Sequence, residues 1–123
     1  MTLLCIAVFA ILGAFARYGQ TQLVQAVAGR DFPWATLSIN VLGSTLMGLL
    51  FFLTSLDGPV DPALRTGVLV GGLGAYTTFS TFSIETLILL EDGEIMKGFL
   101  YMFFSLVLCV GGAAVGAWIS WHL

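Results

Sequence analysis

The sequence predicts an all-α membrane protein with four transmembrane helices and a break in the third. Of its 123 residues, 59% are hydrophobic and 9% are charged, which is too few charges to cover a soluble globule of this size. Four apolar segments use nearly the whole chain, and a spanning helix needs about 20 mainly apolar residues. The break is predicted from residues 71–83, where three glycines accompany five serine and threonine hydroxyls.

The four segments leave no room for a soluble domain, so residues 1–123 are expected to form a single transmembrane domain. The first helix is expected over residues 3–27. It becomes polar from Arg17 onwards, so its second half is expected to face protein, water or lipid headgroups. The second helix is expected over residues 34–54, after a loop at residues 29–33. One of its faces carries polar and small residues at steps of three and four: Thr36, Asn40, Gly43, Ser44 and Gly48.

A turn at residues 57–62 separates the second helix from the third, which is expected over residues 63–90. That length is large even for a tilted span and leaves room for an interruption in its middle. The fourth helix is expected over residues 96–119. Small residues repeat near its end at four-residue spacing, which lets two helix backbones approach closely.

The composition of residues 71–83 makes a continuous helix unfavourable. Glycine costs roughly 1 kcal/mol per residue relative to alanine in a helix interior, and the branched threonine side chain loses rotamer freedom there. In a membrane, non-helical backbone persists only where it is buried in protein or lines a polar cavity. A break in the middle of the third span therefore marks a candidate functional site.

The basic residues give almost no signal for orientation. Four spans place both termini on one side together with Arg65, whereas Arg30 and Lys97 lie on the other side. Because the balance of lysine and arginine orients a membrane protein, one cation against two predicts insertion in both directions. Such a chain can form an antiparallel homodimer with a two-fold axis in the membrane plane. The small-residue faces on several helices also favour a partner.

Charge and motif content exclude several classes of function. The formal net charge of −3 argues against a nucleic-acid partner and leaves no basic cluster for anionic lipid. No serine has a histidine and a carboxylate to activate it, so the sequence predicts no enzyme. Cys5 and Cys109 lie in apolar runs, where a free cysteine behaves as a small hydrophobic residue. The first apolar run is not followed by a small-residue cleavage site, so no removed signal peptide is expected.

Most polar side chains expected in the membrane interior are neutral hydrogen-bond donors: Thr36, Asn40, Thr77, Thr78, Ser80, Thr81, Tyr101 and Ser105. Their hydroxyls either bond back to the preceding helical turn, as is common in apolar helices, or line a path. Phe79 and Phe82 are three residues apart and share a helical face. They are either packing residues or, through electropositive ring edges, part of a path for an anion.

Arg17 and Glu85 are the strong charge candidates within the segments. Both fall in the half of their spanning segments that is nearer the loops carrying Arg30 and Lys97. They could form an ion pair or extend towards the interface, or they could line a vestibule. The sequence leaves these alternatives open.

Three motifs stand out along the chain: Gly71-x-x-Gly74-x-x-Thr77-Thr78-Phe79-Ser80-Thr81-Phe82 in the third segment, Gly13-Ala14-x-x-Arg17-Tyr18 in the first, and Asn40-x-x-Gly43 in the second. Together they resemble the motifs of the Fluc/CrcB fluoride channels. The third-segment motif is highly specific, whereas the first-segment motif alone would be weak. The resemblance covers the whole chain in length and in the order of its motifs.

The resemblance implies a fluoride-selective channel in the cell (inner) membrane that exports fluoride passively and so lowers its toxicity. It further implies a dual-topology, antiparallel homodimer with two fluoride pathways and a central structural sodium ion. In that family the broken third helix presents backbone carbonyls to sodium, which maps here to Gly74 and Thr77. The pore phenylalanines map to Phe79 and Phe82, and the second-helix asparagine maps to Asn40.

The resemblance also implies the rest of the pathway. Tyr101 and Ser105, four residues apart on the fourth helix, match its polar track, whose next position is often a hydroxyl but is Cys109 here. That departure leaves the far end of the track unassigned. The further expected pathway residues are Ser80, Thr81 and Thr36, while Arg17 and Glu85 are expected to be structural or to line a vestibule.

Fluoride is small and tightly hydrated, so a selective path must replace its water with several donors while keeping each site weak enough to leave. Neutral donors and ring edges meet that requirement. The alternative function is a small proton-coupled multidrug exporter, which needs a carboxylate deep in the membrane. Glu85 is the candidate, and it lies too near an interface. The two functions differ in whether fluoride passes without a proton gradient.

Overall fold

The computed structural model describes residues 1–54 and 60–123. Its four long helical segments are α1 (Thr2–Ala28), α2 (Trp34–Leu53), a composite third segment over Pro62–Glu91, and α6 (Ile95–Ser120). Each is long and apolar enough to span a membrane, so the prediction of four apolar helices of membrane-spanning length is confirmed. The expected ranges 3–27, 34–54, 63–90 and 96–119 differ from these bounds by no more than one residue at either end.

The third segment contains four elements: α3 (Pro62–Thr66), η1 (Gly67–Leu73), α4 (Gly74–Tyr76) and α5 (Phe79–Glu91). It begins at an N-cap, because the Asp61 carboxylate accepts hydrogen bonds from the main-chain N–H groups of Ala63 and Leu64 at 2.9 and 3.0 Å. Such a cap satisfies donors that have no partner within the helix. Residues 57–59 of the predicted turn lie outside the described residues.

The predicted break lies between α4 and α5. Thr77 and Thr78 are both extended there, with ψ angles of 160° and 116°. The glycines do not end the helical path themselves, contrary to the expectation from their low helix propensity, because Gly71 and Gly72 lie within η1, a π-helix, and Gly74 begins α4. Gly71 instead allows close packing on α1, since a side chain there would collide with the main chain of Ile6.

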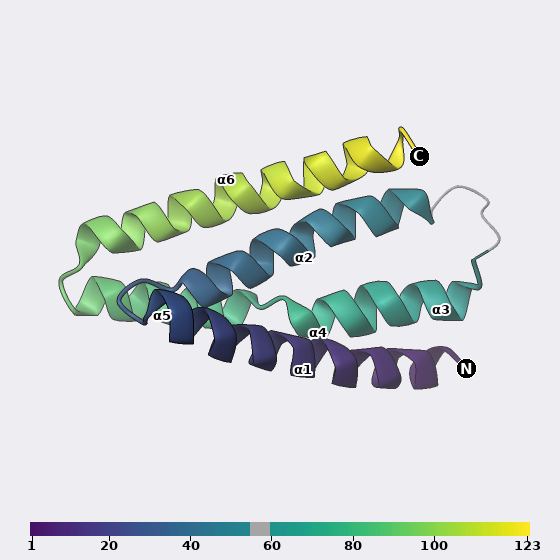
Figure 1. Cartoon of the computed structure of the whole chain (residues 1–123), viewed down its shortest axis with the longest axis horizontal. Coiled ribbons are helices and arrows are strands. Elements are labelled where there is room, and N and C mark those ends of the chain that lie inside the picture. Colours follow the sequence, from purple (N-terminus) through teal and green to yellow (C-terminus); the bar gives the residue numbers. More distant parts are fainter. Residues whose placement is uncertain (55–59) are drawn as a thin grey trace.

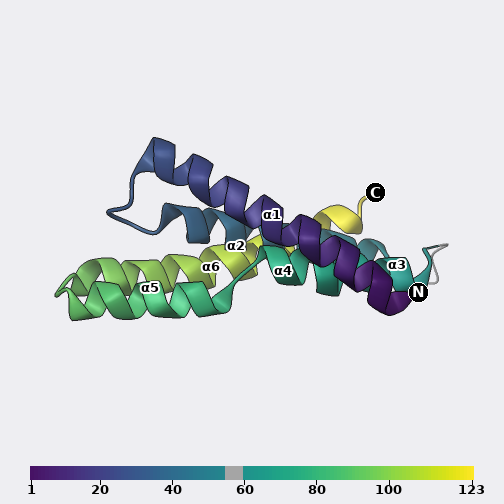
Figure 2. The same ribbon diagram turned by 90° about the horizontal axis from the view of Figure 1, so that it is seen from below.

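The third segment changes its packing partner at the break. Before the break, η1 and α4 pack on α1, and after it α5 packs on α6. Figure 2 shows α1 crossing the first half, while α5 and α6 lie side by side. Helix α2 packs along α6 and also contacts η1 and α5. It therefore lies against both sides of the break.

The small residues of α2 and α6 join these two helices within the chain. A side chain at Gly48 would collide with the main chain of Ala113, and one at Gly116 would collide with the main chain of Thr45. Small residues allow such close approach between membrane helices. These faces were expected to favour a second subunit. Because they are used within one chain, they do not support a dimer.

Both chain termini lie at one end of the molecule, as four spans require (Figure 1). Arg65 belongs to α3 at this end, whereas Arg30 follows α1 and Lys97 begins α6 at the opposite end. The Arg65 Nε atom donates to the Thr54 hydroxyl at 3.0 Å. The cation is thereby held at the C-terminal end of α2, where the helix dipole favours it.

Candidate functional site

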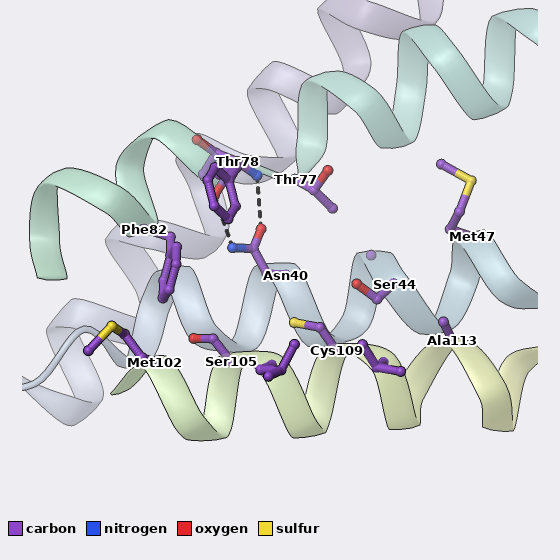
Figure 3. Close-up of a pocket in the computed structure, with 14 residues that line it drawn as sticks. Asn40, Ser44, Met47, Thr77, Thr78, Phe82, Met102, Ser105, Cys109 and Ala113 are labelled. Carbon is purple, nitrogen blue, oxygen red and sulfur yellow. Dashed lines mark hydrogen bonds between the residues drawn. The ribbon is translucent and has the colours of Figure 1, made fainter. Parts of the chain in front are cut away.

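Asn40 on α2 bonds to the broken main chain with both ends of its side-chain amide. Its Nδ2 donates to the Thr78 carbonyl at 3.0 Å, and the Thr78 N–H donates to its Oδ1 at 2.8 Å (Figure 3). In a bilayer, each main-chain group left without a partner costs several kcal/mol. The Asn40 amide supplies these partners where the helix does not.

The hydroxyls around the break are divided between two uses. Thr77 and Ser83 donate back to carbonyls four residues earlier, both at 2.9 Å, as the simpler interpretation of the sequence expected. Thr78 instead caps α5: its hydroxyl accepts from the Thr81 N–H at 3.2 Å and donates to the Thr81 hydroxyl at 3.0 Å. Ser80 lies 3.3 Å from the same Thr78 oxygen. The N-terminus of α5 therefore begins in a cluster of hydroxyls.

The break leaves main-chain carbonyls without hydrogen bonds. In a continuous helix the Thr78 N–H would donate to the Gly74 carbonyl, but here it donates to Asn40. Within the described residues, none of the hydrogen bonds at the break reaches the carbonyl of Gly74 or that of Thr77. Gly74 is exposed. Unwound carbonyls and the C-terminal ends of broken helices are known ligands for sodium in membrane proteins.

A central groove of about 440 Å³ lies between α2, the break, α5 and α6. Its lining is mostly apolar with a few neutral polar side chains: Asn40, Gly43, Ser44, Met47, Thr77, Thr78, Phe79, Phe82, Met102, Ser105, Leu106, Cys109, Val110 and Ala113. Figure 3 shows Ser44 of α2 and Ser105 and Cys109 of α6 below the break, with Phe82 beside Asn40. No charged side chain from the described part of the chain lines it.

Three aromatic rings form a row that leads from the groove, which Phe79 and Phe82 line, to the buried Tyr101. The ring centroids of Phe79 and Phe82 are 5.4 Å apart, and those of Phe82 and Tyr101 are 5.0 Å apart. Phe79 is 77% exposed although it lines the groove. The groove is therefore incompletely covered on the side of Phe79.

Ser105 on α6 contributes an unused donor to the groove. Its residue is 9% exposed, and its Oγ atom has no hydrogen-bond partner among the described residues. Leaving a buried polar group unsatisfied costs about 1–3 kcal/mol, so such a group needs a structural or functional explanation. Its position on the groove makes a bound polar species one such explanation.

Glu85 pairs with hydroxyls rather than with Arg17. Thr36 donates to its Oε1 at 2.9 Å and Tyr101 donates to its Oε2 at 2.7 Å. Arg17 is half-buried on α1, and its guanidinium has no ion pair or hydrogen bond within the described residues. The suggested Arg17–Glu85 pair is therefore absent.

The three-residue cluster around Glu85 was not predicted from the sequence, although a signal for part of it exists. Glu85 and Tyr101 are each eight residues from Gly93, which has a positive φ of 79° in the turn between α5 and α6. Two antiparallel helices joined by a short turn place such equidistant residues side by side. Tyr101 is fully buried, so its hydroxyl needs this acceptor.

Comparison with known proteins identifies the family. The model for "CrcB-like protein, Camphor Resistance (CrcB)" matches residues 4–117. The chain belongs to the CrcB family. A protein from Acidithiobacillus ferrooxidans named fluoride-specific ion channel FluC is 72% identical over 94% of this chain and 92% of its own length. A protein of the same name from Magnetococcus marinus is 50% identical over 94% of this chain and 94% of its own length. Another, from Thermus thermophilus, is 46% identical over 92% of this chain and 97% of its own length.

The resemblance inferred from the three sequence motifs is thus confirmed at the level of the CrcB family. The motif residues Asn40, Thr77, Thr78, Phe79 and Phe82 come together at the groove.

Replacing Asn40 with aspartate should destabilise this CrcB fold. The carboxylate can still accept from the Thr78 N–H, but its second oxygen faces the Thr78 carbonyl, so a hydrogen bond becomes a repulsion. We expect a loss of about 1–3 kcal/mol, measured as a lower thermal-unfolding midpoint in detergent. Ser44→Ala, one helical turn further along α2, is the control and should unfold like the wild type. Equal midpoints for all three proteins would show that the break does not need Asn40.

Proposed function

We propose that this chain forms a fluoride-selective channel, which lets fluoride leave the cytoplasm passively across the cell inner membrane. The observation that carries the proposal is the central groove, in which neutral donors and aromatic rings surround the buried, unpaired Ser105 hydroxyl. The names of the CrcB relatives, which match over more than nine-tenths of this chain, support the same ion.

The chemistry of the groove suits a small, strongly hydrated anion. Asn40 uses one N–H on Thr78 and has a second one to offer, and Ser105 offers its hydroxyl. The edges of the Phe79 and Phe82 rings are electropositive. The groove also adjoins the N-terminus of α5, where the helix dipole favours negative charge. None of these groups carries a full positive charge that would hold the ion tightly.

We assign the pathway to Phe79, Phe82, Asn40 and Ser105 along the groove, with Ser80 and Thr81 beside the break. Tyr101 and Thr36 are assigned to the end of the pathway that lies near Glu85. Because both of their hydroxyls donate to Glu85, contact with an anion there requires one of these hydrogen bonds to open. Glu85 and Arg17 are assigned to the adjoining vestibule.

The proposed channel is an antiparallel, dual-topology homodimer. The nearly even distribution of cations between the two sides supports insertion in both directions. The groove supports a second copy as the cover, because Phe79 lines it and yet remains 77% exposed. The same assembly would bring the exposed Gly74 carbonyls of two subunits to a shared axis.

We propose that a structural sodium ion is held by the carbonyls of Gly74 and Thr77. These residues fit the ion, because no hydrogen bond from the described residues reaches their carbonyls and α4 presents the negative end of its dipole. When bound, the ion would satisfy the carbonyls that the break has freed. Two subunits would supply two such pairs of oxygens.

Phe82→Ile and Phe79→Ile should each greatly reduce fluoride efflux from liposomes while the protein folds normally. Isoleucine keeps similar apolar volume, and such swaps usually cost less than about 1.5 kcal/mol, but it removes the ring edge. Phe99→Ile is the matched control, because Phe99 is exposed on α6 outside the groove. Efflux is measured with a fluoride electrode and no proton gradient. Wild-type efflux in both groove variants would place the pathway elsewhere.

Dual topology predicts that a tag at the C-terminus is accessible from both sides of the membrane in about equal amounts. An impermeant label applied to intact spheroplasts should modify about half of the tags, and the rest should react only after lysis. A reporter of known single orientation serves as the control. Complete labelling, or none, before lysis would contradict the antiparallel assembly.

Removal of sodium should weaken the dimer. With sodium replaced by a large organic cation, the dimer should dissociate at a lower protein concentration in detergent, measured by size-exclusion chromatography. Adding sodium back should restore it. Thr77→Ser keeps the main-chain carbonyl and should behave like the wild type. An unchanged dissociation profile after exhaustive exchange would argue against a structural sodium ion.

A further inference from the structure

The hydroxyls of the spanning helices separate into those used by the main chain and those that are free for a ligand. Most of them donate to a carbonyl three or four residues earlier, which satisfies them locally. Examples on α2, α5 and α6 are Ser38, Thr45, Thr54, Ser83, Thr86 and Ser120. A serine that lacks this bond and faces a groove has a donor to offer.

Ser44 is such a serine. It lies on α2 one turn beyond Asn40 and lines the central groove, and within the described residues its hydroxyl donates to no main-chain carbonyl. Its two neighbours on the chain have other contacts. A side chain at Gly43 would collide with Thr77, and Thr45 donates to the Val41 carbonyl at 2.8 Å.

The opposite wall of the groove offers only a weak donor at this level. Cys109 lies on α6 one turn beyond Ser105, and its sulfur is the side-chain hydrogen-bond partner of the Ser44 hydroxyl across the groove (Figure 3). Sulfur is a weak acceptor, so an anion in the groove can take over this donor. A thiol is a poor hydrogen-bond donor compared with a hydroxyl. Beyond Ser105, an anion in the groove would therefore find its strongest donor on α2, not on α6.

We propose that Ser44 is a contact residue for the anion in the half of the groove beyond Asn40 and Ser105. Its hydroxyl provides the donor that the Cys109 thiol cannot match. The proposed route thus changes walls, from Ser105 on α6 to Ser44 on α2. This inference rests on the proposed fluoride pathway and extends it to a residue outside the motif-derived set.

Ser44→Ala tests this assignment. Hydrogen bonds to charged groups contribute more than neutral ones, so loss of this donor should slow fluoride efflux from liposomes about tenfold. Ser83→Ala is the matched control, because the same atom is removed from an exposed serine that bonds to its own helix. Both variants should elute and unfold like the wild type. Efflux from Ser44→Ala equal to that from Ser83→Ala would overturn the proposal.

A compensating change separates ion contact from packing. In the Ser44→Ala background, Cys109→Ser places a hydroxyl on the facing wall at the same level and should restore most of the lost efflux. A packing defect at Ser44 would not be repaired in this way, so absence of rescue would contradict the assignment. If wild-type liposomes themselves released no fluoride, the proposed function would fall, and the role of Ser44 with it.

Discussion

The hydrogen-bonded pair between the Asn40 amide and the Thr78 main chain is the interaction on which the rest of the molecule depends. A helix interrupted within a bilayer exposes donors and acceptors that lipid cannot satisfy. Asn40, on the neighbouring α2, provides one donor for the Thr78 carbonyl and one acceptor for the Thr78 N–H group. An apolar side chain at this position would leave the break unsatisfied, and a carboxylate would satisfy only the N–H group.

The break has two consequences that follow from helix polarity. At the end of α4, the carbonyls of Gly74 and Thr77 receive no hydrogen bond from the described residues at the break. At the start of α5, Thr78 caps the N-terminus of the helix. The first end favours a cation and the second favours an anion. One interruption therefore creates adjacent regions of opposite electrostatic preference without a charged side chain. This is the physical basis for proposing both a sodium ion and a fluoride path in so small a protein.

The packing of the helices explains why the groove remains open. Small residues bring α2 and α6 together along a close seam through Gly48 and Gly116, while the third segment leaves α1 at the break and joins α6. The change of partner leaves a groove beside the break, between α2, α5 and α6. The unpaired hydroxyl of Ser105 and the hydroxyl of Ser44, which has only the weak Cys109 sulfur as its acceptor, face this space. The groove is thus a product of the break and not of a particular loop.

Much of this architecture was predictable because it depends on local composition and chain length. Apolar runs of membrane-spanning length determined the four helices, and the threonine pair among glycines indicated the interruption. The near balance of Arg30 and Lys97 against Arg65 predicts insertion in both directions, and this stays a prediction. The specific motif from Gly71 to Phe82 predicted the family. None of these signals requires knowledge of which helices touch.

Tertiary structure decided the features that depend on contacts between distant segments. Periodicity shows that Gly71 and Gly116 lie on helix faces, but only packing reveals that these faces meet α1 and α2 of the same chain. Glu85 accepts hydrogen bonds from two hydroxyls on other helices, and no local sequence pattern indicates these partners. Whether a serine bonds to its own helix or faces a groove also depends on rotamer and neighbours. The sequence by itself determined where the chain crosses and where it breaks, whereas the fold decided which polar groups remain free, because a donor is free only when no neighbour has taken it.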